Sequence, residues 1–183
     1  MRYILRTCAG REKMAEELIK EIPSLEICYD DVGGAMKNFL KSLELAGEDA
    51  VVNLEDDIIL TSNFQSKLES VVDKMPDSVI QFFSMRKADL TVGSRWDRGK
   101  NYLMAQCTYF PKKISKGILA FSRNYANINH KSEPLDSMVG DYLHRTKQKY
   151  FIHVPSLVDH RVGVSIIDSR RASTNRQSFT FES

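Results

Sequence analysis

The stretch VVNLEDDIILTSNF, residues 51–64, places three acids directly after an apolar run and then returns at once to apolar residues. Adjacent carboxylates repel one another, and burying one of them without a partner is costly. The acidic triplet, Glu55, Asp56 and Asp57, must therefore be solvated, capped by hydrogen-bond donors, or gathered around a cation. Side-chain alternation loosens at a strand's end, so two or three oxygens can converge there on Mg²⁺ or Mn²⁺.

The residues before the acidic triplet alternate between strand and helix patterns. Residues 2–7, 24–31 and 50–54 read as strands, and residues 11–21 and 32–49 read as helices. The third strand is a continuous apolar run, typical of a parallel sheet covered on both faces. This order predicts an α/β fold with three layers, α/β/α, and a mostly parallel central sheet. Ligands of such sheets bind outside the carboxyl ends of the strands, where the acidic triplet lies.

The rest of the chain predicts further strands and helices of the same domain. We expect helices over 64–75 and 136–148, strands over 78–84, 102–110 and 150–160, and a long mobile loop over 86–101. The sequence predicts one domain over 1–167 and a flexible tail over 168–183, because the tail has little apolar periodicity.

Composition narrows the classes of protein that this chain could belong to. With 183 residues, 42% hydrophobic and 27% charged, it has enough apolar residues for one core. A net charge of +2 is too small to attract the whole protein strongly to nucleic acid or to a membrane surface. Three cysteines without metal-like spacing indicate reduced thiols, and no apolar run is long enough to span a membrane. We therefore expect a cytoplasmic protein, or one in the host cytoplasm if a phage encodes it.

A bare acidic triplet is more often a solvated turn, but its place after an apolar strand reverses that preference. VVNLEDDIILTSNF resembles the strand and DXD element of GT-A glycosyltransferases, especially the LEDD form of lipopolysaccharide-type enzymes. Residues 33–49, GGAMKNFLKSLELAGED, resemble the helix before that strand. Residues 151–167, FIHVPSLVDHRVGVSII, resemble the family's late P-x-L-V-x-H-x-G-x-S segment. The resemblance covers residues 1–167 in order, and a chain of this size would be a compact phage or bacterial version.

The resemblance implies a GT-A-like domain that transfers a sugar from a nucleotide-sugar, with a UDP-sugar as the first expectation. Asp57 and His160 would bind Mn²⁺ or Mg²⁺, which would stabilise the leaving nucleoside diphosphate as a Lewis acid. Glu55 and Asp56 would contact the ribose or the donor sugar. The nucleoside pocket and the phosphates would be contacted by Arg6, Thr7, Asp30, Asp31 and Lys37.

An inverting enzyme of this kind also needs a general base near the acceptor hydroxyl. We expect Asp141 in this role, followed by Asp136, although Asp136 could equally be a helix N-cap. Trp96, with Arg95 and Arg98, is expected either to contact the acceptor or to anchor its own segment to the domain. The acceptor would be a saccharide or a modified base in phage DNA.

Two other functions stay open. A nucleotidyltransferase would share the α/β frame and should carry a glycine-rich phosphate loop with Arg and Lys after the first strand. Residues 7–13, TCAGREK, offer one glycine there. A non-catalytic module that binds a nucleotide-sugar or a saccharide would have kept the fold without turnover, and the intact acidic triplet with His160 argues against it.

Overall fold

A seven-stranded sheet in the order β2-β1-β3-β7-β5-β8-β6 forms the centre of the computed structural model, which describes residues 1–31, 34–128, 135–162 and 176–183. Strands β1, β2, β3, β5 and β8 run parallel to one another, whereas β7 and β6 run antiparallel to their neighbours. The strands are β1 (Arg2–Cys8), β2 (Leu25–Asp30), β3 (Val51–Glu55), β5 (Val79–Gln81), β6 (Arg95–Arg98), β7 (Cys107–Phe110) and β8 (Lys149–Ile152).

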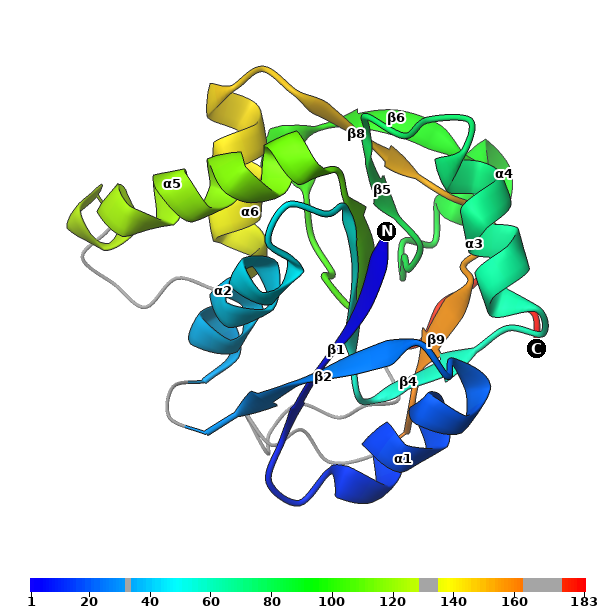
Figure 1. Cartoon of the computed structure of the whole chain (residues 1–183). Coiled ribbons are helices and arrows are strands. Elements are labelled where there is room, and N and C mark those ends of the chain that lie inside the picture. Colours follow the sequence, from blue (N-terminus) through cyan, green and yellow to red (C-terminus); the bar gives the residue numbers. More distant parts are fainter. Residues whose placement is uncertain (32–33, 129–134, 163–175) are drawn as a thin grey trace.

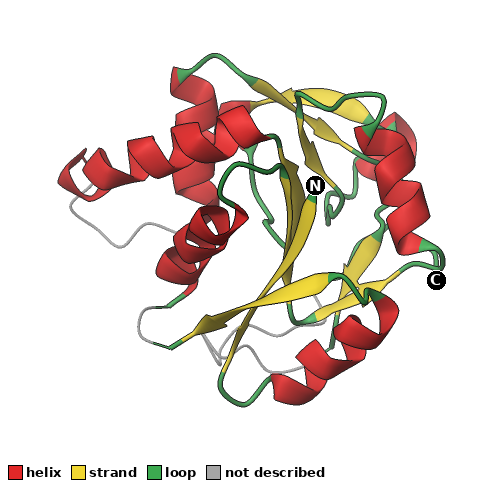
Figure 2. Ribbon diagram, viewed as in Figure 1, coloured by secondary structure: helices red, strands yellow, loops and turns green. Residues whose placement is uncertain are grey.

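Helices cover both faces of the central sheet, as Figures 1 and 2 show. One face packs against α1 (Glu12–Glu21), α3 (Phe64–Val72) and a two-stranded sheet of β4 (Ile58–Leu60) and β9 (Val158–His160). The other face packs against α2 (Ala35–Ala46), α5 (Lys112–Ile128) and α6 (Leu135–Arg145). The predicted three-layer α/β fold with a mostly parallel sheet is therefore confirmed.

Alternation along β1 and the helical spacing of α2 explain how two cores form. Neighbouring residues of β1 point to opposite faces, so Ile4 enters one core and Leu5 the other. In α2, Phe39 and Leu43 lie one turn apart and are fully buried against the Ile4 side of the sheet. The helix ends at Ala46, and the capping residue Gly47 has a φ of 60°, which glycine adopts without steric cost.

The carboxyl ends of the first three strands lie side by side, as the sequence predicts. Strand β1 pairs in parallel with β2 and with β3, and its Arg6 lies opposite Glu55 while Cys8 lies opposite Asp30. Polar residues that are far apart in the sequence therefore collect at one edge of the sheet. This edge is the place where open α/β sheets bind ligands.

The prediction of a long mobile loop over 86–101 is wrong. This segment contains α4 (Asp89–Val92), strand β6 at the edge of the sheet, and a short 3₁₀-helix (Gly99–Asn101). An edge strand exposes alternate side chains, so its polar composition resembles that of a loop. Gly99 packs so tightly against the backbone of α6 that a Cβ there would lie 2.4 Å from the His144 nitrogen.

Other elements also differ from the prediction in extent or were not predicted. The expected strand over 150–160 is two strands of different sheets, β8 and β9, with Pro155, which lacks an N–H donor, between them. The expected strand over 102–110 is reduced to β7. The segment that follows Pro111 forms the long helix α5, which was not predicted from the sequence.

The end of the expected tail is hydrogen-bonded to the domain. The Ser178 backbone N–H donates to Asp159 Oδ1 at 2.7 Å, and the Thr61 hydroxyl donates to the Glu182 carbonyl oxygen at 2.7 Å. Residues 163–175 lie outside the described part of the chain, so the domain boundary at residue 167 stays a prediction. Within the described ranges, no helix is both long and apolar enough to cross a bilayer.

Candidate functional site

The acidic triplet forms the crossing between the two sheets. Glu55 is the last residue of β3, and Asp56 and Asp57 lead directly into β4. Strand β4 pairs with β9 in a register that places Ile58 opposite His160. As a result, His160 Nε2 lies 3.2 Å from Asp57 Oδ2, although the two residues are about a hundred positions apart. Asp56 is 4% exposed and His160 3%, whereas Glu55 and Asp57 are partly exposed, so this crossing is largely buried and is not a solvated turn.

Arg11 is the direct partner of two of the three acids. It precedes the first turn of α1, and its Nη1 lies 2.5 Å from Asp56 Oδ1 and 2.8 Å from Asp57 Oδ2. Burial raises the pKa of Asp56, and Arg11 opposes this only in part. Burial also acts on Asp57, but contact with His160 and Arg11 outweighs it and lowers the pKa of Asp57. Asp57 is therefore the more firmly ionised member of the pair.

Arg6 holds Glu55 in place through hydrogen bonds within the protein. Its Nε donates to Asn53 Oδ1 at 2.6 Å, and its Nη2 donates to Glu55 Oε1 and to the Ala105 carbonyl oxygen, each at 3.0 Å. Burial raises the pKa of Glu55, and the charge of Asp57 adds to this while Arg6 acts against it. Because Arg6 is only 5% exposed and uses these donors within the protein, it orients Glu55 more directly than it lines a pocket.

Asp136 lies close enough to the acidic triplet for its charge to act on Glu55, whereas no described contact links Asp141 to the triplet. Asp136 Oδ2 accepts a hydrogen bond from the Met104 backbone N–H at 3.0 Å, and its charge also raises the pKa of Glu55. This bond reaches another segment, so it is not an N-cap bond to α6. Burial raises the pKa of Asp136 itself. Asp141 lies further along α6 and accepts only a long, 3.4 Å hydrogen bond from the Tyr125 hydroxyl among the contacts described for it.

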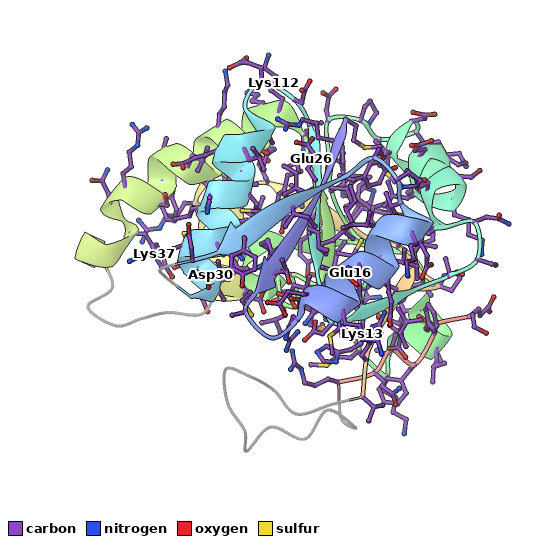
Figure 3. All side chains as sticks on the ribbon, turned by 60° about the horizontal axis from the view of Figure 1, so that its bottom comes forward. Lys13, Glu16, Glu26, Asp30, Lys37 and Lys112 are labelled. Carbon is purple, nitrogen blue, oxygen red and sulfur yellow. The ribbon has the colours of Figure 1, made fainter. Side chains whose placement is uncertain are left out.

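Thr7, Asp30, Asp31 and Lys37 lie around the carboxyl ends of β1 and β2. Thr7 is buried, and its carbonyl oxygen accepts a hydrogen bond from Asn38 Nδ2 at 3.2 Å. Figure 3 shows Asp30 and Lys37 at the same edge of the molecule. Asp31 pairs with Lys41 at 3.1 Å, and Lys37 is exposed. Asp30, Asp31 and Lys37 form a charged rim beside the buried acids, and Thr7 is buried.

Trp96, Arg95 and Arg98 are not brought to the acidic triplet. They lie on β6, four strand positions from β3 in the sheet order, which is about 19 Å across the sheet. The Trp96 ring contacts the Phe151 ring edge-on, with centroids 5.3 Å apart. The geometry therefore favours the alternative in which Trp96 anchors its segment to the domain.

Arg95→Gln is expected to lower stability by about 3 kcal/mol, because Arg95 Nη1 lies 2.6 Å from the fully buried carboxylate of Asp89. Removing the guanidinium would leave that charge without its ion-pair partner. The free energy of unfolding in urea would measure the effect, and Arg98→Gln, on the exposed side of the same strand, provides the matched control. Unchanged stability with weaker acceptor binding would return Arg95 to the acceptor role.

The residues around Asp57 fit a divalent cation. Asp57 Oδ1 is buried without a hydrogen-bond partner. His160 Nε2 is buried beside Asp57 Oδ2, and His160 Nδ1 lies 2.7 Å from the Arg161 carbonyl oxygen. The 3.2 Å between Asp57 Oδ2 and His160 Nε2 is close to the roughly 3.0 Å between adjacent ligands of an octahedral Mg²⁺. Within the described ranges, no three His, Cys, Asp or Glu side chains gather as ligands. Such an ion would need further ligands from substrate phosphates.

Three residues that the structure places in or beside this site were not predicted from the sequence. Arg11 follows Gly10 after β1, which was the only signal of a phosphate-type loop. Asn53 was visible as the one polar residue in the apolar run of β3, and polar residues in buried strands usually have a specific partner. Gln106 gave no signal. Its side-chain Oε1 is buried without a partner, and its carbonyl oxygen accepts a hydrogen bond from the Glu55 N–H.

Comparison with known proteins supports the fold and nothing finer. No family model and no curated protein sequence matches the chain. A197 from STIV, a viral protein, is 12% identical and aligns with a TM-score of 0.54 over 100% of this chain and 96% of its own. A protein assigned as a glucose-1-phosphate thymidylyltransferase from Bacillus anthracis, in complex with a sucrose, is 10% identical, with a TM-score of 0.53 over 100% and 98%. The chain is thus an α/β domain with the architecture of these two structures.

Proposed function

We propose that this chain is a metal-dependent glycosyltransferase of GT-A type, which moves a sugar from a nucleotide-sugar to an acceptor hydroxyl. One observation carries the proposal. Asp57 and His160 meet in a largely buried site at the carboxyl edge of the sheet, where Asp57 Oδ1 has no hydrogen-bond partner, and a second carboxylate, Asp136, is close enough to act on the pKa of Glu55. The pKa of Asp57 is lowered and that of Asp136 is raised. The first suits a charged metal ligand, and the second suits a proton acceptor.

In this proposal the described residues divide into three roles. Asp57 and His160 hold Mn²⁺ or Mg²⁺, which when bound would stabilise the charge of the departing nucleoside diphosphate. Thr7 and the charged rim of Asp30, Asp31 and Lys37 face the nucleoside and the phosphates. Glu55 and Asp56 face the ribose or the donor sugar. A UDP-sugar is the first donor to test.

Asp136 takes the proton from the acceptor hydroxyl. The raised pKa of Asp136 lies closer to neutral pH, and a general base works best when its pKa is near the working pH. The acceptor is a saccharide or a modified DNA base. Lys37, at the exposed rim, is long enough to add positive charge near the phosphates.

A nucleotidyltransferase is the second candidate, and the position of Arg11 favours it. This arginine lies shortly after β1, and its side chain extends to the acids at the ends of the strands, where a phosphate-loop arginine would meet the phosphates. Such an enzyme would join a nucleoside triphosphate and a sugar phosphate, and it would release pyrophosphate. The two candidates therefore differ in the product that leaves the site.

A product assay is expected to show release of nucleoside diphosphate from one nucleotide-sugar, dependent on Mn²⁺ and abolished by chelation. The protein would be incubated with a panel of nucleotide-sugars, and separately with nucleoside triphosphates and glucose-1-phosphate. Slow hydrolysis of the donor without acceptor would already demonstrate turnover, and a saccharide acceptor should accelerate it. Pyrophosphate release alone would establish the nucleotidyltransferase instead. Tight, metal-dependent nucleotide binding with no product would favour the binding module.

A further inference from the structure

The Arg11 guanidinium stands between the two carboxylates that adjoin the proposed metal. A single nitrogen, Nη1, contacts both Asp56 Oδ1 and Asp57 Oδ2. Asp57 Oδ2 is also the oxygen that faces His160 Nε2. The oxygen best placed to bind a cation together with His160 is therefore already in contact with a positive charge that belongs to the chain.

A metal ion and the guanidinium are incompatible neighbours in this arrangement. A divalent ion bound to Asp57 Oδ2 and His160 Nε2 would lie within a few ångströms of Arg11, in a buried site where like charges repel strongly. Without the metal, removal of Arg11 would leave the buried Asp56 and the partly buried Asp57 adjacent without the guanidinium that both contact. Arg11 thus stabilises the metal-free form of the site and opposes the metal-bound form.

The chain allows the side chain of Arg11 to move while its backbone stays fixed. The backbone is held by hydrogen bonds from the Arg11 N–H to the Cys8 carbonyl oxygen, at 3.2 Å, and from the Ala15 N–H to the Arg11 carbonyl oxygen, at 3.1 Å. Among the described contacts, the guanidinium bonds only to the two acids. Its planar fork matches phosphate oxygens as well as it matches carboxylates.

We propose that Arg11 is a resident counterion of the acidic triplet, which yields its place to the divalent metal only when a diphosphate offers it new partners. This inference rests on the proposed function and adds a coupling to it: metal and diphosphate bind together, and the metal alone binds weakly. Occupation by Arg11 lowers the intrinsic affinity for the metal. The diphosphate offsets this by accepting the displaced guanidinium.

The test is a titration of Mn²⁺ into the protein without nucleotide, in which electron paramagnetic resonance measures the concentration of free Mn²⁺. Arg11→Gln is expected to bind Mn²⁺ about tenfold more tightly than the unaltered protein. Adding a nucleoside diphosphate should raise the Mn²⁺ affinity of the unaltered protein strongly and that of Arg11→Gln much less. Arg161→Gln is the matched control, because Arg161 Nη1 pairs with Glu17 at 2.6 Å and lies next to the site without contacting the acid side chains.

Equal or weaker Mn²⁺ binding by Arg11→Gln, with Arg161→Gln unchanged, would overturn the inference and leave the proposed function standing. Absence of Mn²⁺ binding in every variant, with and without nucleotide, would overturn the metal site and the inference together. If Arg11→Gln does not fold, Arg11→Lys replaces it, since a lysine keeps the charge but loses the planar fork. Because the charge stays, Arg11→Lys should bind Mn²⁺ alone about as weakly as the unaltered protein, but a nucleoside diphosphate should raise its Mn²⁺ affinity less. A nucleotide response equal to that of the unaltered protein would overturn the inference.

Discussion

Asp57→Asn is expected to abolish the Mn²⁺-dependent binding of nucleoside diphosphate, with a loss of affinity of more than about 100-fold. The substitution keeps the shape of the side chain but removes the charge of the most firmly ionised acid in the site. Calorimetric titration of the nucleotide, with and without Mn²⁺, would measure the loss. The fold should persist, because Arg11 retains Asp56 as a partner and the backbone bond from the Arg161 N–H to the Asp57 carbonyl oxygen is unaffected.

Asp159→Asn provides the control for this experiment. Asp159 is also a buried acid of the small sheet, it adjoins His160 in sequence, and its Oδ1 accepts a hydrogen bond from the Ser178 N–H. Its loss would therefore test the effect of removing a buried negative charge near the site without touching the proposed ligand. If both variants lost nucleotide binding equally, or if Asp57→Asn kept its Mn²⁺-dependent affinity, the assignment of Asp57 as a metal ligand would be wrong.

The part of the site that the sequence could predict is the part set by local pattern. Apolar runs followed by polar residues predicted the ends of β1, β2 and β3, and parallel pairing then brings those ends together wherever the sheet forms. Glu55, Asp56 and Asp57 follow from that alone. His160 was assigned through family resemblance, and its proximity to Asp57 depends on the pairing of β4 with β9, which no local pattern reveals.

The contacts that escaped prediction depend on the packing of one element against another. Arg11 reaches the acids because α1 begins beside the end of β1, and nothing in the composition of TCAGREK indicates that direction. Asp136 and Asp141 are five residues apart on one helix, so helical periodicity alone places them on different sides but leaves open which side faces the sheet. The docking of α6 against the Met104 segment decides between them, and it brings Asp136 close enough to act on the pKa of Glu55.

Asp136→Asn is expected to reduce the rate of sugar transfer by about 10²- to 10⁴-fold, the usual contribution of a general base. The oxygen of the substituted amide would still accept the hydrogen bond from the Met104 N–H, so nucleotide affinity and fold should be preserved. Asp141→Asn is the matched control on the same helix and should retain most of the activity. The reverse result, with Asp141→Asn inactive and Asp136→Asn active, would assign the proton transfer to Asp141 and require a movement of α6.

The pH dependence of this variant separates a base from a merely buried acid. Because burial raises the pKa of Asp136 in the folded protein, the carboxyl holds its proton to a higher pH there than in the unfolded chain. Above the ordinary pKa of an aspartate, the unfolded state thus binds fewer protons at this group, and its contribution to stability falls as pH rises through the folded-state pKa. Asp136→Asn removes that loss, so the variant should be at least as stable as the unaltered protein near pH 7.

The rate of sugar transfer by the unaltered protein should instead rise with pH through the same raised pKa, since only the ionised carboxylate can accept the proton. The variant should lack this rise. A rate that fell in proportion to a fall in stability would make Asp136 a structural residue, and another base would have to be sought at the edge of the site.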